Sequence, residues 1–89
     1  MQTAPVVLIT GAAKRIGSSI AKCLHARGFS VVIHHRNSAA EAEQLRLELE
    51  QARPDSVLVL QAELGEFDRL PEIIAKTVGR FGRLDALVN

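Results

Sequence analysis

Two glycines with basic residues between them form the segment of this sequence best suited to chemistry. The segment runs from Thr10 to Gly17 and contains Thr-Gly-Ala-Ala-Lys-Arg-Ile-Gly. Gly11 permits a tight turn, and Gly17 allows a following helix to pack closely on the preceding strand. The free amides and the dipole at the start of that helix favour a pyrophosphate. The spacing therefore predicts phosphate binding, although paired glycines are also typical of ordinary turns.

The residues after a second apolar run indicate which cofactor this loop would bind. An NAD site usually places an acid roughly 20 residues beyond the first glycines, to hold the ribose 2′-hydroxyl. No acid occurs between residues 28 and 40, where the sequence offers His34, His35, Arg36, Asn37 and Ser38. Arg36 can form a bidentate pair with a 2′-phosphate, and Ser38 can add a hydrogen bond. Lys14 or Arg15 could approach the same phosphate, so the pattern favours NADPH over NAD and argues against S-adenosylmethionine.

Charge is distributed unevenly along the 89 residues. Residues 1–40 carry five basic side chains and no acid, whereas residues 41–89 carry six basic and ten acidic ones. A positive half favours a phosphate-bearing ligand, unless it reflects chance clustering of surface charge. Nucleic acid is not an expected partner, because the chain has no dense basic stretch and few aromatic residues for base stacking.

Other classes of protein are disfavoured by composition. No apolar run approaches the roughly 18 residues of a membrane span, so no membrane partner is expected. The N-terminus lacks the basic start of a secretory signal, which favours a cytoplasmic location. The single cysteine, Cys23, permits no internal disulfide and is expected to be a small core residue. The pair His34 and His35 lacks a third ligand, so no metal site is expected.

Apolar runs alternate with helical periodicity along the whole chain. Continuous β-branched runs predict strands buried on both faces, and apolar residues three or four positions apart predict helices. The predicted strands are 5–10, 30–34, 57–60 and 84–88. Because helical crossovers connect them, the strands must be parallel. The sequence predicts an α/β fold, a Rossmann-type doubly wound parallel sheet.

The helices also receive predicted caps and buried faces. Ser38 with Glu41 is predicted to form a capping box, and Asp68 to cap the third helix. His25 is expected to favour the negative end of the first helix. The predicted buried positions are Ile16, Ile20 and Leu24 in the first helix, Ala42, Leu45, Leu49 and Ala52 in the second, and Leu70, Ile73, Ile74, Val78 and Phe81 in the third.

The fourth predicted strand would lie at an edge of the sheet and ends at Asn89. A long apolar edge strand is normally paired or protected. We therefore expect residues 1–89 to be the NADP-binding N-terminal part of a single larger Rossmann-fold domain, truncated at the fourth strand.

The glycine loop, together with Leu87-Val88-Asn89, resembles the short-chain dehydrogenase/reductase family. Most members have a third glycine where Arg15 stands. The loop and the segment from His35 to Ala42 are similar to the pteridine reductase branch, in which an arginine replaces the middle glycine. That arginine lies near the cofactor phosphates and reaches toward the bound pterin.

The resemblance implies further cofactor contacts. Lys14, Arg15, Ile16, Arg36 and Ser38 would bind NADPH. Glu63 and Leu64 would flank the adenine, although the family usually has aspartate at the first of these positions. Asn89 would begin an Asn-Asn-Ala motif beside the adenosine. The complete candidate cofactor site comprises Gly11, Lys14, Arg15, Ile16, Gly17, His35, Arg36, Asn37, Ser38, Glu63, Leu64 and Asn89.

The resemblance implies an activity for the complete protein as well, namely NADPH-dependent reduction of a dihydropterin or dihydrofolate by a homotetramer. Such reductases use a Tyr-x-x-x-Lys pair, and this chain has no tyrosine. We therefore expect no catalytic residue in it and no activity from it alone. The alternatives are another short-chain reductase, such as a 3-oxoacyl carrier-protein reductase, a non-catalytic NADP-binding domain, and an unstable product without activity.

Overall fold

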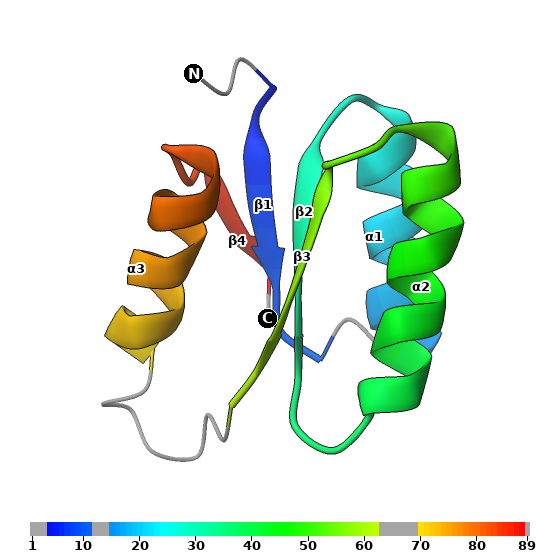
Figure 1. Ribbon diagram of the computed structural model, residues 1–89, viewed down its shortest axis with the longest axis horizontal. Coiled ribbons are helices and arrows are strands. Elements are labelled where there is room, and N and C mark those ends of the chain that lie inside the picture. Colours follow the sequence, from blue (N-terminus) through cyan, green and yellow to red (C-terminus); the bar gives the residue numbers. More distant parts are fainter. Residues whose placement is uncertain (1–3, 12–14, 63–69, 89) are drawn as a thin grey trace.

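The computed structural model describes residues 4–11, 15–62 and 70–88 and confirms the predicted alternation of strands and helices. The elements are β1 (Val6–Ile9), α1 (Arg15–Ala26), β2 (Ser30–His35), α2 (Ala39–Ala52), β3 (Val57–Gln61), α3 (Leu70–Phe81) and β4 (Ala86–Val88). All pairings are parallel, and the strand order is β3-β2-β1-β4. Helices α1 and α2 cover one face of the sheet and α3 covers the other (Figure 1). The Rossmann-type α/β arrangement is therefore confirmed.

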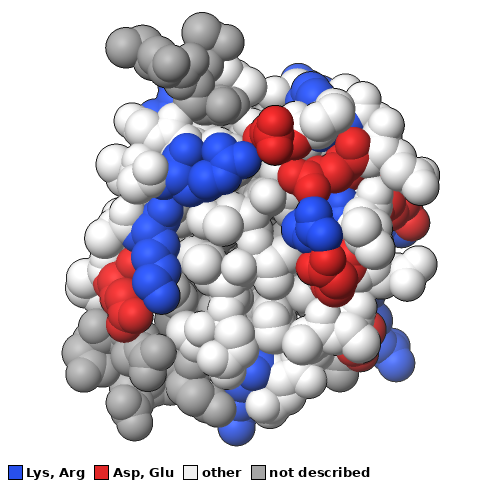
Figure 2. Space-filling view, in the orientation of Figure 1, with Lys and Arg blue, Asp and Glu red and all other residues white. Residues whose placement is uncertain are grey.

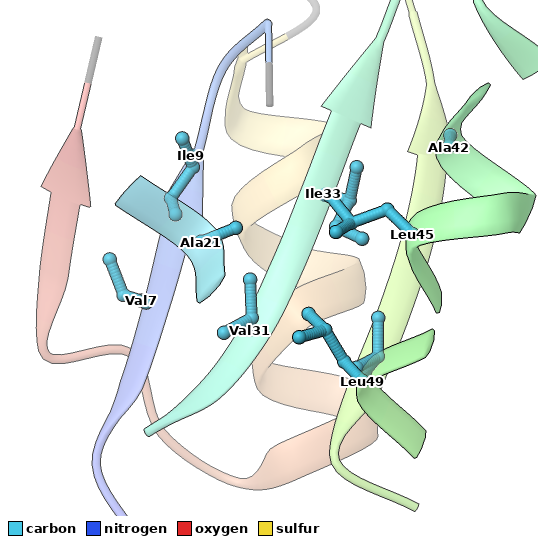
Figure 3. Packing of buried hydrophobic residues seen from close by; sticks show 9 residues of the cluster. Val7, Ile9, Ala21, Val31, Ile33, Ala42, Leu45 and Leu49 are labelled. Carbon is cyan, nitrogen blue, oxygen red and sulfur yellow. The ribbon is translucent and has the colours of Figure 1, made fainter. Parts of the chain in front are cut away.

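The strands contribute apolar side chains to both faces of the sheet. On one face, Val7 and Ile9 of β1 and Val31 and Ile33 of β2 pack with Ala21 of α1 and with Ala42, Leu45 and Leu49 of α2 (Figure 3). On the other face, the alternate strand residues Val6, Leu8 and Val32 pack with Ile73 and Phe81. Because successive strand residues point to opposite faces, a strand covered on both sides must be apolar throughout.

The start of β1 is tied to the segment that precedes β4. The Val6 amide donates a hydrogen bond to the Asp85 carboxylate over 2.8 Å, and the Arg83 guanidinium donates to the same carboxylate. The hydrogen bond from Arg83, followed by that from Val6, holds the pKa of Asp85 below its usual range. Asp85, which directly precedes β4, therefore ties the start of β4 to the start of β1, although Val6 and Asp85 lie 79 positions apart in the sequence.

The buried face of α1 differs from the prediction. Ile16 is 76% exposed, whereas Ala21 and His25 are buried and Ile20 and Leu24 are partly buried. The prediction that Cys23 is a core residue is wrong, because its side chain is exposed. A residue two positions from Ala21 lies about 200° around the helix axis, and therefore on the solvent side.

The other helices agree with the prediction in part. In α3, Val78 is exposed and Thr77 is buried in its place, with its hydroxyl donating to the carbonyl of Ile73 over 2.9 Å. Ser38 does stand at the N-cap of α2, and its carbonyl accepts from the Ala42 amide. Its side chain makes no capping hydrogen bond, so the predicted capping box is not formed. Ala52 is exposed, contrary to the prediction, and Asp68 lies outside the described residues.

Helices long and apolar enough to span a bilayer are absent from the three described stretches.

Candidate nucleotide-binding edge

The carboxyl ends of β1, β2 and β3 lie together at one edge of the sheet, the lower edge in Figure 1. Strand β1 lies between β2 and β4, so the crossover direction reverses beside it. In open α/β sheets, ligands bind outside the carboxyl ends of the strands at such a reversal. The glycine turn follows β1 directly, so the fold places it where a ligand is expected.

Gly11 begins the turn and has a backbone conformation that favours glycine. Its φ is 67°, in the left-handed region, and a Cβ atom built on it would meet no atom within 4 Å. The backbone conformation, rather than crowding, therefore favours glycine here. The preceding Thr10 donates from its amide and from its hydroxyl to the carbonyl of Val88, over 2.9 and 3.3 Å. These bonds fix the start of the turn against β4.

His34, the penultimate residue of β2, contacts the turn from inside the protein. Its Nδ1 accepts a hydrogen bond from the Gly11 amide over 3.2 Å, and its Nε2 lies 2.7 Å from the carbonyl oxygen of Ala62. Sequence reasoning missed this role, because it named His34 only among the polar residues at the end of the second strand and as half of a possible metal pair. The available signal was a polar side chain that directly follows the apolar run 31–33 of a buried strand.

Arg15 occupies the first position of α1 with a φ of 45°, one of two non-glycine residues with positive φ in the described chain. Left-handed backbone is unfavourable for a residue with a Cβ atom. The strained position is the one where most short-chain reductases carry glycine, according to the resemblance. Arg15 and Ile16 are both exposed at this edge, and the Arg15 carbonyl accepts from the Ser18 hydroxyl over 2.8 Å.

The end of β2 and the residues after it place two buried and two exposed candidate residues next to each other. Arg36 and Asn37 are exposed, while His35 and Ser38 are buried. The Gln61 side chain donates to the Arg36 carbonyl over 2.9 Å, and the Ala62 amide donates to the His35 carbonyl over 3.1 Å. The end of β3 therefore supports the turn that carries Arg36.

Several observations test whether this edge fits an anionic nucleotide. The buried Nδ1 of His35 has no hydrogen-bond partner among the residues described. Buried nitrogens without partners are rare, and a ligand hydroxyl or phosphate would satisfy this one. Arg15 and Arg36 supply exposed positive charge, and Figure 2 shows basic side chains at the lower edge of the molecule. The donor set suits phosphates, whereas the described residues contain no cluster able to hold a metal ion. Lys14, Glu63, Leu64 and Asn89 lie outside the described residues.

A second polar cluster lies at the opposite edge of the sheet and takes no part in this site. His25 is buried, and its Nε2 donates to the Ser56 hydroxyl oxygen over 2.7 Å, since that hydroxyl donates to the Arg53 carbonyl. The Arg53 guanidinium donates to the carbonyls of His25 and Phe29. Burial, followed by the positive charge of Arg53, lowers the pKa of His25. His25 therefore joins α1 to the start of β3, beyond its predicted helix-end role.

A groove of about 440 Å³ lies between α1 and α2. It is lined by Ser18, Lys22, Ala40, Glu41, Gln44, Leu45 and Glu48. Lys22 and Glu48 form an ion pair across it at 3.2 Å, and both side chains are about half exposed. Such exposed pairs contribute little free energy.

Comparisons with known proteins agree with this geometry. Residues 5–89 match the sequence family described as short chain dehydrogenase. The chain is 40% identical to pteridine reductase 1 of Leishmania tarentolae, over 98% of the chain and 36% of that protein. It is 34% identical to a 3-oxoacyl-(acyl-carrier-protein) reductase of Synechocystis, over 98% and 35%, and 35% identical to one of Staphylococcus aureus, over 100% and 36%. The chain spans about a third of the length of these curated relatives.

Proposed function

The chain belongs to the short-chain dehydrogenase family, and on that basis we propose that the complete protein is an NADPH-dependent reductase of a pterin or dihydrofolate. Residues 1–89 would supply the adenosine-phosphate half of its cofactor site and would be the N-terminal part of one Rossmann-fold domain. The single observation that carries this proposal is the glycine turn at the carboxyl end of β1, with Gly11 and the first residue of α1, Arg15, both in left-handed backbone.

The choice of NADPH is supported by the end of β2. The exposed Arg36 stands where an NAD enzyme would place an acid, and no acid occurs from residue 28 to residue 40. An arginine suits a 2′-phosphate because its planar fork can donate two hydrogen bonds to it. An acid here would repel that phosphate. The buried Ser38 and the unpartnered Nδ1 of His35 would add donors or acceptors next to it.

The choice of a pterin is supported by Arg15 and by the 40% identity to a pteridine reductase. Arg15 is a large basic residue in a backbone conformation that favours glycine. An arginine in such a position indicates that its charge is useful there. By resemblance to the pteridine reductase branch, that charge would lie near the cofactor phosphates and reach toward the substrate.

The residues of this chain would bind and orient NADPH, and they would transfer no proton. Bound NADPH would supply the hydride that, with one proton, reduces the substrate C=N bond and leaves NADP⁺. The amides at the start of α1 would hold the pyrophosphate, and Ile16 would cover it with an apolar side chain that is 76% exposed. Lys14, Arg36, Asn37 and Ser38 would hold the 2′-phosphate. Gly17, Glu63, Leu64 and Asn89 complete the proposed contacts.

These 89 residues contain no tyrosine. We therefore propose that residues outside them supply the proton donor and the remaining substrate contacts. Residues 1–89 alone would therefore transfer no hydride. The complete protein would act in the cytoplasm as a homotetramer.

A second candidate is reduction of a 3-oxoacyl thioester. It is supported by the identities of 34% and 35% to 3-oxoacyl-(acyl-carrier-protein) reductases. The same cofactor edge would serve that reaction, so the fold does not discriminate between the two. A non-catalytic NADP-binding protein would also use this edge, but it would show no hydride transfer.

The test is turnover of the complete protein, followed by the absorbance of NADPH. Dihydrobiopterin, dihydrofolate and a 3-oxoacyl thioester are compared, each with NADPH and with NADH. Turnover of a pterin with NADPH is expected. Turnover of the thioester without any pterin activity would favour the second candidate. Binding of NADPH with no turnover of any substrate would favour the hypothesis of a non-catalytic NADP-binding protein.

A matched pair of variants tests the cofactor assignment separately. Arg36→Ala is expected to raise the KM for NADPH while leaving the KM for NADH unchanged. Arg27→Ala removes an exposed arginine from the turn at the opposite edge and should change neither. Equal effects of Arg36→Ala on both cofactors would contradict the role of Arg36.

A further inference from the structure

His34 lies where it can join the ends of three neighbouring strands. It is buried on β2, with 5% of its surface exposed. Strand β2 stands between β1 and β3 in the sheet. Neighbouring strands lie about 4.8 Å apart, so the ends of β1 and β3 are too far from each other for a direct backbone hydrogen bond. A side chain on β2 is therefore placed to contact both.

The two ring nitrogens of His34 make those contacts in one protonation state. The Gly11 amide can only donate, so Nδ1 must accept, over 3.2 Å. The Ala62 carbonyl can only accept, so Nε2 must carry the proton that it donates, over 2.7 Å. The neutral ring protonated on Nε2 satisfies both partners. Among the residues described, the ring therefore has no unused nitrogen.

The two partners belong to different parts of the proposed cofactor site. Gly11 starts the turn that would hold the pyrophosphate, and its φ of 67° depends on where its amide points. Ala62 directly precedes Glu63 and Leu64, which are proposed to flank the adenine. The bond to His34 directs the Gly11 amide into the protein, which fixes the orientation of the peptide unit at the start of the turn. The bond to Ala62 fixes the backbone at the end of β3.

We propose that His34 is a positioning residue for NADPH. Through its two ring nitrogens, His34 would hold the pyrophosphate turn and the adenosine end of the site in fixed positions relative to each other. This inference rests on the proposed function. His34 would touch neither the cofactor nor the substrate, and its effect would pass through Gly11 on one side and Ala62 on the other.

Two conservative substitutions separate these contacts. In His34→Asn, the amide oxygen can occupy the place of Nδ1 and accept from Gly11, but the bond to Ala62 is lost. In His34→Gln, the amide nitrogen can reach the place of Nε2 and donate to Ala62, but the acceptor for Gly11 is lost. His34→Leu loses both. A matched control is His25→Gln, which alters another buried, hydrogen-bonded histidine at the opposite edge.

Dissociation constants are measured on the complete protein for NADPH and for adenosine 2′-monophosphate, which lacks the pyrophosphate. Losing one hydrogen bond is expected to weaken binding about two- to tenfold. His34→Gln should weaken NADPH by this factor and leave adenosine 2′-monophosphate unchanged. His34→Asn should weaken both probes by the same factor. His25→Gln should change neither constant, since His25 lies at the opposite edge of the sheet.

A purely structural role would give a different pattern. The Asn and Gln variants would then lower the thermal midpoint and affect both probes alike, and this would overturn the inference. Unchanged affinities in all three His34 variants would overturn it as well, while the proposed function would stand. Failure of the wild-type protein to bind NADPH would overturn the proposed function and this role with it.

Discussion

Replacing Arg15 by glycine should stabilise the complete protein while weakening its binding of NADPH. The φ of 45° at Arg15 is a left-handed conformation, which costs a non-glycine residue about 1–2 kcal/mol. Glycine removes that cost but gains freedom in the unfolded chain, which offsets about 0.5–1 kcal/mol. The expected net gain is about 0.5–1 kcal/mol. For a protein of the relatives' size, this raises the thermal midpoint by about 1–4 °C.

The loss of affinity has a separate cause, because it follows the positive charge rather than the backbone. Removing an exposed cation that contacts a phosphate is expected to weaken NADPH about tenfold. Arg15→Ala removes the charge and keeps the unfavourable φ, so it should lose affinity and gain no stability. Asp55→Gly relaxes the other non-glycine residue with positive φ, which is 59°. Asp55 lies before β3 at the opposite edge of the sheet, so the Asp55→Gly variant should be more stable than the wild type and bind NADPH with unchanged affinity.

Stability is measured by thermal and urea unfolding without cofactor, and affinity by titration with NADPH. A lower midpoint for Arg15→Gly would refute the strain at Arg15. An equal gain in Arg15→Ala would also refute it, since alanine cannot relax this backbone. Unchanged affinity in both variants would refute a phosphate contact by this arginine.

Two further predictions concern the opposite edge of the sheet. Gly28→Ala should lower the free energy of unfolding, measured with urea, by about 1–2 kcal/mol, because Gly28 has a φ of 99°. The added methyl group would meet no atom within 4 Å, so the whole cost would come from the backbone conformation. The pKa of His25 is lowered by burial and then by Arg53, with Glu50 opposing, so the unfolded chain binds a proton more readily than the folded one. Stability should fall as pH drops through the unfolded value of about 6.5. Urea midpoints above and below that pH should differ less in His25→Gln than in the wild type, and an equal difference would contradict the assignment.

The strands and their order along the chain could be predicted because each leaves a local signal. Residues 6–9 and 31–33 are all apolar and mostly β-branched, as strands covered on both faces require. The helix faces were harder to predict. Ile16 and Val78 fit a helical stripe in the sequence, yet both are exposed, while the buried positions include His25 and Thr77. Periodicity fixes the spacing of a stripe but not the direction in which the sheet lies.

The candidate site likewise has features that the sequence predicts and features that only the tertiary structure reveals. The glycine spacing, the lack of acid after β2 and the arginine at position 15 are present in the sequence itself, and they predict a phosphate-binding loop and its cofactor. Only the tertiary structure brings His34 between Gly11 and Ala62, residues 51 positions apart. It also gives Arg15 its left-handed backbone. Local sequence determines which conformations and charges are available to each segment. Strand order and register decide which groups from distant segments meet, because these contacts form only after the sheet has assembled.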